Sequence, residues 1–232
     1  MSASITIPTD YSKKFAELSH EEVVEVHLSL QTIRITSDFA LTSCLHELES
    51  ATRHSRGLRN TRIFAPSLCA FAILDQIGSC YKDLAKPAHP NEGSGIPHAL
   101  YYFCNMNAMS EEVKALYAFR NGLVHDGSFT NQSKKTRQWY MFRFDSELPL
   151  PIRLANTPWD GSASNVGHDT TTYINMRIFT DLVLSSLDNL RRSILERKND
   201  IEVLYSREDI IHKFILWRPV SSLKTFAEFD LD

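Results

Sequence analysis

The feature that most constrains the fold is a run of apolar residues spaced three or four apart between residues 66 and 84. Pro66 suits the first turn of a helix, where a missing N–H removes no hydrogen bond. The spacing predicts one long amphipathic helix whose buried stripe consists of Leu68, Phe71, Leu74, Ile77, Tyr81 and Leu84. Residues 86–97, rich in proline and glycine, follow as a segment that can form neither a helix nor a central strand, and this loop separates two helices.

Capping signals mark helices near both ends of the chain. Ser19 and Glu22 form a capping box ahead of apolar residues at helical spacing, although the same residues also alternate as in a strand. A second helical pattern runs over residues 39–48. Near the end of the chain, Ser206 and Asp209 predict the start of a last short helix.

A further helix is predicted to begin at Ser110, a good N-cap residue, with Glu111 and Glu112 placed favourably at the positive end of the helix dipole. Its apolar stripe consists of Val113, Leu116, Phe119 and Leu123. Gly127 provides the usual glycine stop. Arg120 and His125 therefore lie on this helix.

Residues 137–155 change to a period of two and predict a short hairpin, after which helical spacing returns over residues 175–198. Together these patterns predict a mainly α protein, an up-and-down helical bundle with a small β-hairpin insertion before the last long helix. We expect residues 1–232 to form a single domain with its bundle core at about 19–198. Residues 199–232 would be a C-terminal extension.

The composition argues against a metalloprotein and against a membrane-spanning protein. A hydrophobic fraction of 43% and a charged fraction of 23% are typical of soluble globular proteins. The four cysteines are not at zinc-ligand spacing and are expected to be reduced thiols, so neither a metal nor a cofactor is predicted. Without an apolar run long enough to span a membrane, the expected location is cytoplasmic.

The net charge of −3 argues against a protein that grips nucleic acid by bulk electrostatics, so any RNA contact must be local. The basic residues Lys134, Lys135 and Arg137 form a small cluster that is a candidate RNA-binding site. The alternative is a solvated loop, which is the commoner fate of short charge runs.

Arg120 and His125 are candidate catalytic residues, but their spacing is a weak signal by itself. Nine histidines and fifteen arginines scattered uniformly give roughly two Arg–His pairs with spacings of this kind by chance. A second pair, Arg207 and His212, is present. Only the first pair lies at the end of a helix with an apolar stripe and has an asparagine, Asn121, directly after the arginine.

The segment that carries the first pair resembles the conserved segment of HEPN domains. It reads LYAFRNGLVHDG over residues 116–127, and the preceding helix, SLCAFAILDQIGSCYKDL, is similar to the helix that precedes the motif in a subset of that family. The resemblance implies a helical bundle that pairs as a homodimer and places two copies of the motif in one cleft. It implies catalytic roles for Arg120 and His125, with Asn121 as the polar residue that often follows the arginine. The hairpin departs from the minimal bundle.

The resemblance further implies a metal-independent endoribonuclease of toxin or defence type, with RNA as substrate and an antitoxin or regulatory protein as a candidate partner. Neutral His125 would accept the proton of a ribose 2′-hydroxyl, and Arg120 would stabilise the charge that develops on the phosphorane. One difficulty is geometric. Steps of about 100° place Arg120 about 140° away from His125 on an ideal helix, so Arg120 must reach around or come from a second chain.

Two alternatives remain open. In a purely structural interpretation Arg120 pairs with Glu112 or Asp126, Asn121 makes local hydrogen bonds and His125 terminates the helix. The chain would then be a non-catalytic homodimeric interaction module of the same fold. A bundle that binds a small molecule would instead require a deep apolar pocket.

Overall fold

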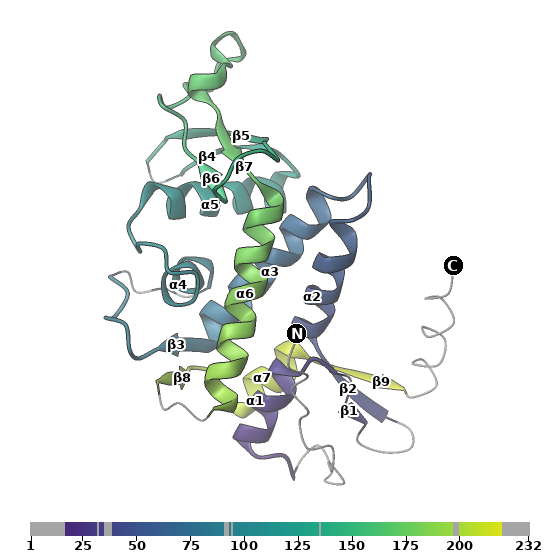
Figure 1. The fold of residues 1–232 in the computed structure, drawn as a ribbon. Coiled ribbons are helices and arrows are strands. Elements are labelled where there is room, and N and C mark those ends of the chain that lie inside the picture. Colours follow the sequence, from purple (N-terminus) through teal and green to yellow (C-terminus); the bar gives the residue numbers. More distant parts are fainter. Residues whose placement is uncertain are drawn as a thin grey trace. The chain divides into compact units, whose positions relative to one another are not determined.

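The structure, a computed structural model, describes residues 17–31, 33–34, 39–90, 93, 95–134, 136–196 and 200–219 (Figure 1). The fold is mixed α/β. Helices form about half of it (52%), in partial agreement with the expected mainly α bundle, but several small sheets take the place of the single small hairpin. The chain divides into two compact units. Unit 1 holds the described parts of residues 1–48 and 205–232, and unit 2 holds those of residues 49–204.

Unit 1 joins the two ends of the chain in one three-stranded antiparallel sheet. Its strands lie in the order β1-β2-β9, with bounds β1 (Ile33–Arg34), β2 (Phe39–Ser43) and β9 (Ile215–Pro219). The helix predicted over residues 39–48 is wrong for its first half, because β2 pairs along its whole length with β9, from Phe39 opposite Pro219 to Ser43 opposite Ile215. A partner this distant in sequence is invisible to local periodicity.

Two short helices accompany this sheet, α1 (His20–Leu28) and α7 (Arg207–Phe214). The predicted capping box is present at α1, where the Ser19 hydroxyl accepts from the Glu22 N–H and the Glu22 carboxylate accepts from the Ser19 N–H at 2.6 Å. Ser206 caps α7 as predicted, through the Asp209 N–H. The rings of His27 and Phe214 stack 5.2 Å apart and join the two helices.

The helices of unit 2 pack around α3 (Phe64–Cys80), the helix that the apolar spacing predicted. Phe71 lies at the centre of the packing, with its ring 5.5 Å from Phe119 and 5.1 Å from Phe179. Phe119 belongs to α5 and Phe179 to α6, so the predicted contact of Phe71 with Phe119 is confirmed. The helices that pack on α3 are α4 (Ile96–Tyr102), α5 (Glu111–Asn121) and α6 (Met176–Leu195). The helix α2 (Cys44–Ser55) begins in unit 1 and continues into unit 2.

The helix α3 ends earlier than predicted, and the loop after it is more ordered. Its chain continues as β3 (Tyr81–Asp83), which pairs with β8 (Ile201–Val203). The segment 86–97 was expected to contain no helix, but its last two residues open α4, with Pro97 in the first turn, where proline is tolerated. A Cβ on Gly78 would overlap the Gly95 carbonyl, so this glycine permits the close approach of α3 to the start of α4.

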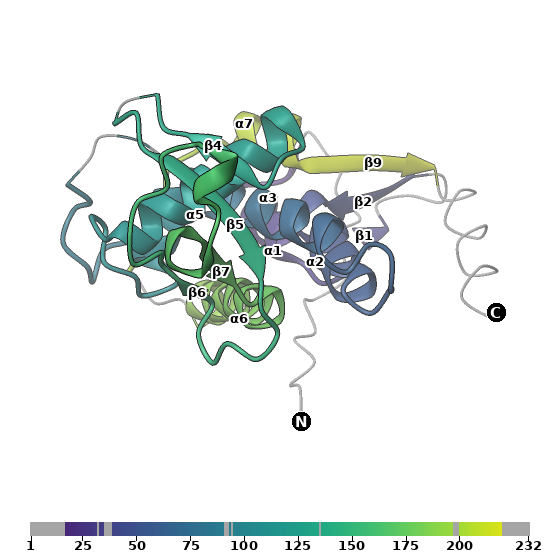
Figure 2. The ribbon, with the colours of Figure 1, turned by 90° about the horizontal axis from the view of Figure 1, so that it is seen from above.

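A four-stranded sheet of unit 2 replaces the predicted hairpin. Its order is β4-β5-β7-β6, with bounds β4 (Thr130–Gln132), β5 (Trp139–Phe144), β6 (Ile152–Arg153) and β7 (Thr172–Ile174). The strand at 139–144 is confirmed, but a hairpin confined to 137–155 is wrong, because β7 pairs with both β5 and β6 and separates them. The sheet lies over α5, as Figure 2 shows, and the ring of Phe142 is 5.0 Å from that of Phe119.

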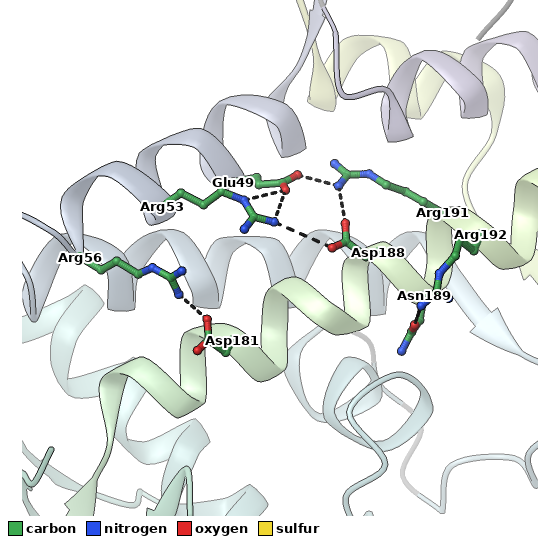
Figure 3. Close-up of polar contacts among 8 residues, drawn as sticks. All are labelled: Glu49, Arg53, Arg56, Asp181, Asp188, Asn189, Arg191 and Arg192. Atoms are coloured by element: carbon green, nitrogen blue, oxygen red, sulfur yellow. Dashed lines mark hydrogen bonds and ion pairs between the residues drawn. The ribbon is translucent and has the colours of Figure 1, made fainter. Parts of the chain in front are cut away.

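Within unit 2, a buried ion pair ties the middle of α2 to α6 (Figure 3). Arg191 donates to Glu49 at 2.6 Å and to Asp188 at 3.1 Å, and the Arg191 side chain is only 2% exposed. Burial alone would raise the pKa of Glu49, but the charges and hydrogen bonds of Arg191 and Arg53 outweigh burial, so the pKa of this carboxyl is lowered. The ionised Glu49–Arg191 pair therefore joins α2 to α6.

The cysteines and the helix lengths agree with the composition. All four cysteines are free, and burial raises the pKa of the Cys104 thiol to about 11. Among the described residues, no helix is both long and apolar enough to cross a membrane.

Candidate active site

The helix that carries the motif changes its winding in the middle of the motif. Ser110 caps α5 through the Val113 N–H at 3.3 Å, and the α-helix runs to Asn121. It continues as one π-helical turn, η2 (Gly122–Asp126). Gly127 then ends the helix in the left-handed conformation, with φ of 59°, as the predicted glycine stop requires.

The π turn brings the two candidate catalytic side chains together. Arg120 Nη1 lies 3.3 Å from His125 Nε2, and the same nitrogen donates to Asn121 Oδ1 at 3.2 Å. The 140° separation expected on an ideal helix is therefore wrong for this segment. Because a π turn closes through i→i+5 hydrogen bonds, residues five apart come onto one face of the widened helix. Arg120 reaches His125 within one chain.

Gly122 is a position in the π turn where the surrounding backbone leaves no room for a side chain. A Cβ on this glycine would lie 2.8 Å from the Thr130 carbonyl oxygen and 2.9 Å from the Ser128 carbonyl oxygen, closer than real Cβ atoms approach backbone. The chain leaving the helix thus folds directly back over Gly122 to begin β4. Because Gly122 has no side chain, the π turn can pack directly against the backbone that leads into the sheet.

An open cavity of about 1100 Å³ brings most of the predicted site residues together. Arg120, Asn121 and His125 all line it, and so does Lys134 from the turn between β4 and β5. Arg137 lies in the same turn with φ of 60°, exposed and outside the cavity lining. Lys135 lies outside the described residues. The structure therefore joins one member of the basic cluster to the Arg–His pair.

The cavity also contains residues that sequence reasoning did not assign to the site. Lys114 and Tyr117 line it from α5, and His89 and His98 line it from the loop before α4 and from α4 itself. The rings of the two histidines lie 4.5 Å apart. No cluster of three or more potential metal ligands occurs in the part of the chain that the structure describes. Helical spacing from Arg120 back to Tyr117 was the one signal that could have identified a member of this set.

The contact of Arg120 with His125 has a chemical consequence. A guanidinium group can only donate hydrogen bonds, so a hydrogen bond across this contact has Arg120 Nη1 as its donor and His125 Nε2 as its acceptor. A neutral imidazole is the form that accepts a proton from a hydroxyl. His125 is exposed and Arg120 half-buried, so both can meet a ligand in the cavity. The arrangement can thus hold a phosphate beside a general base.

The second Arg–His pair has different surroundings. Arg207 and His212 lie on α7 in unit 1, and the Arg207 guanidinium donates to the Leu18 carbonyl at 2.6 Å and to Glu208 at 3.0 Å. Comparisons of the chain with protein-family models, with curated proteins and with solved structures found no match. The case for function therefore rests on the chain's own residues.

Proposed function

We propose that this chain is a metal-independent endoribonuclease in which Arg120, Asn121 and His125 form the catalytic site. The observation that carries the proposal is the 3.3 Å contact between Arg120 and His125 at the wall of an open cavity. The resemblance of residues 116–127 to the HEPN motif points to the same chemistry and, beyond the mixed α/β architecture, to a HEPN-like helical core.

In the proposed reaction His125 Nε2 removes the proton of a ribose 2′-hydroxyl, and the 2′-oxygen attacks the adjacent phosphorus. The bond from phosphorus to the 5′-oxygen breaks, which leaves a 2′,3′-cyclic phosphate on one fragment and a 5′-hydroxyl on the other. Arg120 turns from His125 to the phosphate and stabilises its added negative charge with a fork of donors. Asn121 orients Arg120 through the 3.2 Å hydrogen bond.

The leaving 5′-oxygen needs a proton, and we assign it to the protonated His125 of a second copy in a twofold dimer, as the resemblance implies. An imidazole that serves as base in one copy and acid in the other requires the two motifs to share a cleft. The state of association in solution tests this part separately. A chain that cleaves RNA as a monomer at every concentration would remove the dimer from the proposal and leave His125 in place.

The test of the proposed function is RNA cleavage in excess chelator, with analysis of the fragment ends. The proposal predicts cleavage by the wild-type chain, with 2′,3′-cyclic phosphate and 5′-hydroxyl ends. Absence of cleavage would favour the non-catalytic interaction module, in which the same fold serves only to bind partners. Cleavage that requires an added divalent metal would also contradict the mechanism.

A further inference from the structure

One face of α5 lines the cavity for more than two helical turns before the Arg–His pair. Glu111, Lys114, Ala118 and Asn121 follow one another three or four residues apart and all contribute to the cavity wall. Tyr117 lies beside Ala118 on the same wall. The candidate site is therefore one end of a longer surface along the helix.

Tyr117 is the conspicuous side chain of that surface. It is a large aromatic side chain with 44% of its surface exposed. In the described residues, its ring makes no aromatic contact and its hydroxyl no hydrogen bond, whereas Tyr140, which lines the same cavity, is 8% exposed and stacks on Phe142. A single exposed aromatic residue is ordinary on a protein surface. Tyr117, however, lines the cavity beside Arg120 and Asn121, where its exposed ring is available to a bound ligand.

We infer that Tyr117 is the stacking platform for an unpaired base next to the cleaved phosphate, and that the substrate is therefore single-stranded RNA or an RNA loop. The placement of the phosphate rests on the proposed function. Aromatic side chains bind unpaired bases through their faces, and a base held in a duplex stack cannot offer its face to a side chain. A continuous duplex is excluded for this reason.

The spacing along α5 fits a strand of nucleotides. Tyr117 precedes Arg120 by three residues, which is about 4.5 Å along the axis at 1.5 Å per residue. That span is on the order of one to two stacked base steps of about 3.4 Å. A phosphate held at Arg120 and a base on Tyr117 would thus belong to the same or an adjacent nucleotide.

Basic side chains along the cavity could bind further phosphates of the same strand. Lys114 lies almost one turn before Tyr117, and Lys134 faces the cavity from the β4–β5 turn, so two cations are available to neighbouring phosphates. Lys114 is held by Glu111 at 2.6 Å, which makes Lys134 the stronger candidate. The chain as a whole carries a net charge of −3, so binding would be local and specific to this surface.

Binding by the full chain with His125→Ala tests the inference without cleavage. Fluorescence anisotropy would compare a short unstructured RNA with the blunt duplex of the same sequence, each with and without Tyr117→Ala. We expect the single strand to bind more tightly than the duplex, and Tyr117→Ala to weaken single-strand binding about 5- to 150-fold, the range for one lost base stack. Tyr117→Phe keeps the ring and should retain the affinity. Tyr205→Ala, in unit 1, removes a tyrosine that does not line the cavity and should leave RNA binding unchanged.

The inference is overturned if Tyr117→Ala binds the single strand as well as its parent, or if duplex and single strand bind equally. Circular dichroism of each variant separates loss of binding from loss of fold, and Tyr117→Phe provides a second variant with the ring intact. Because binding is measured in a chain without His125, the result is independent of cleavage. Tyr117-dependent binding by a chain that never cleaves RNA would support the base platform and reject the ribonuclease.

Discussion

The two Arg–His pairs of this chain have the same spacing in the sequence but different arrangements of their side chains. Arg120 and His125 are in contact at 3.3 Å, with Asn121 beside them, on the wall of a cavity. Arg207 and His212 lie on an ordinary α-helix, α7, where an interval of five residues turns the two side chains about 140° apart. The Arg207 guanidinium instead binds the Leu18 carbonyl and Glu208.

The difference shows that spacing alone does not make this site. What separates the two pairs is the π turn over residues 122–126, which in turn depends on a glycine over which the chain folds back. π turns are uncommon and occur often at functional sites, where the local distortion aims side chains that an α-helix would spread. The four predictions below use the second pair, or another matched position, as the control.

The largest effect is expected from His125→Ala, which removes the proposed base. The cleavage rate should fall about 10²- to 10⁴-fold, the usual contribution of a positioned proton-transfer group. His212→Ala, also at an exposed histidine, should leave the rate unchanged. Initial rates on the same RNA measure both. Equal losses in the two variants would mean that the geometry of the first pair has no catalytic meaning.

Glu49→Gln should give the next largest effect, on stability. Removing one partner of the buried pair costs about 3 kcal/mol near pH 7, with Asp188 still in contact with Arg191. Because the pKa of Glu49 is lowered in the folded state, its stabilising contribution is present above the ordinary value of 4.5 and is lost as the pH falls through the folded pKa. Urea unfolding should therefore show wild type and variant converging in acid.

The control for this variant lies in the unit without the site. Glu208 on α7 pairs with Arg207 at the protein surface, so Glu208→Gln should change the unfolding free energy little at either pH. A gap between wild type and Glu49→Gln that stays constant from neutral to acid pH would contradict the role given to the ionised Glu49.

Arg120→Lys should reduce cleavage about 10- to 100-fold. Lysine keeps the charge but loses the planar fork that can bind two phosphate oxygens, and hydrogen bonds between charged groups are worth about 1.5 to 3 kcal/mol. Arg207→Lys makes the same exchange in the second pair and should leave the rate as it is. Steady-state kinetics that show a normal rate for Arg120→Lys would reject phosphate binding by Arg120.

Gly122→Ala should have the smallest effect of the four, a loss of about 2 kcal/mol in unfolding free energy, because the added methyl group overlaps the backbone of residues 128–130. Cleavage should fall with it, since the π turn positions Arg120 against His125. A Cβ on Gly127 would meet nothing within 4 Å, so Gly127→Ala should cost only about 1 kcal/mol for its left-handed backbone. Thermal unfolding that ranks Gly127→Ala as the more damaging change would contradict this view of the turn.

Local signals in the sequence predicted where several of the helices begin. Ser19, Ser110 and Ser206 cap helices as expected, and the apolar stripe around Phe71 packs against Phe119. Strand pairing was the weak point. The strand at residues 39–43 and the order of the β4-β5-β7-β6 sheet depend on partners far along the chain, which periodicity in a short window cannot reveal.

The sequence supplied the candidate residues of the proposed site but not their geometry. The sequence motif identifies Arg120, Asn121 and His125, and the structure brings them together in one cavity with Lys134. Ideal helix geometry placed Arg120 on the wrong side, because no simple pattern in the sequence announces a π turn. Tyr117 was missed because an aromatic residue at helical spacing is usually part of a core.

The central claim is that Arg120 and His125 catalyse attack by a ribose 2′-hydroxyl without a metal. Its most direct test uses one oligonucleotide with a mapped cleavage position and a second that carries a single 2′-deoxyribose just before that phosphate, both in excess chelator. The mechanism predicts that the all-ribose strand is cut to a 2′,3′-cyclic phosphate and that the substituted strand is not cut there. Cleavage of the 2′-deoxy position at the same rate would contradict it.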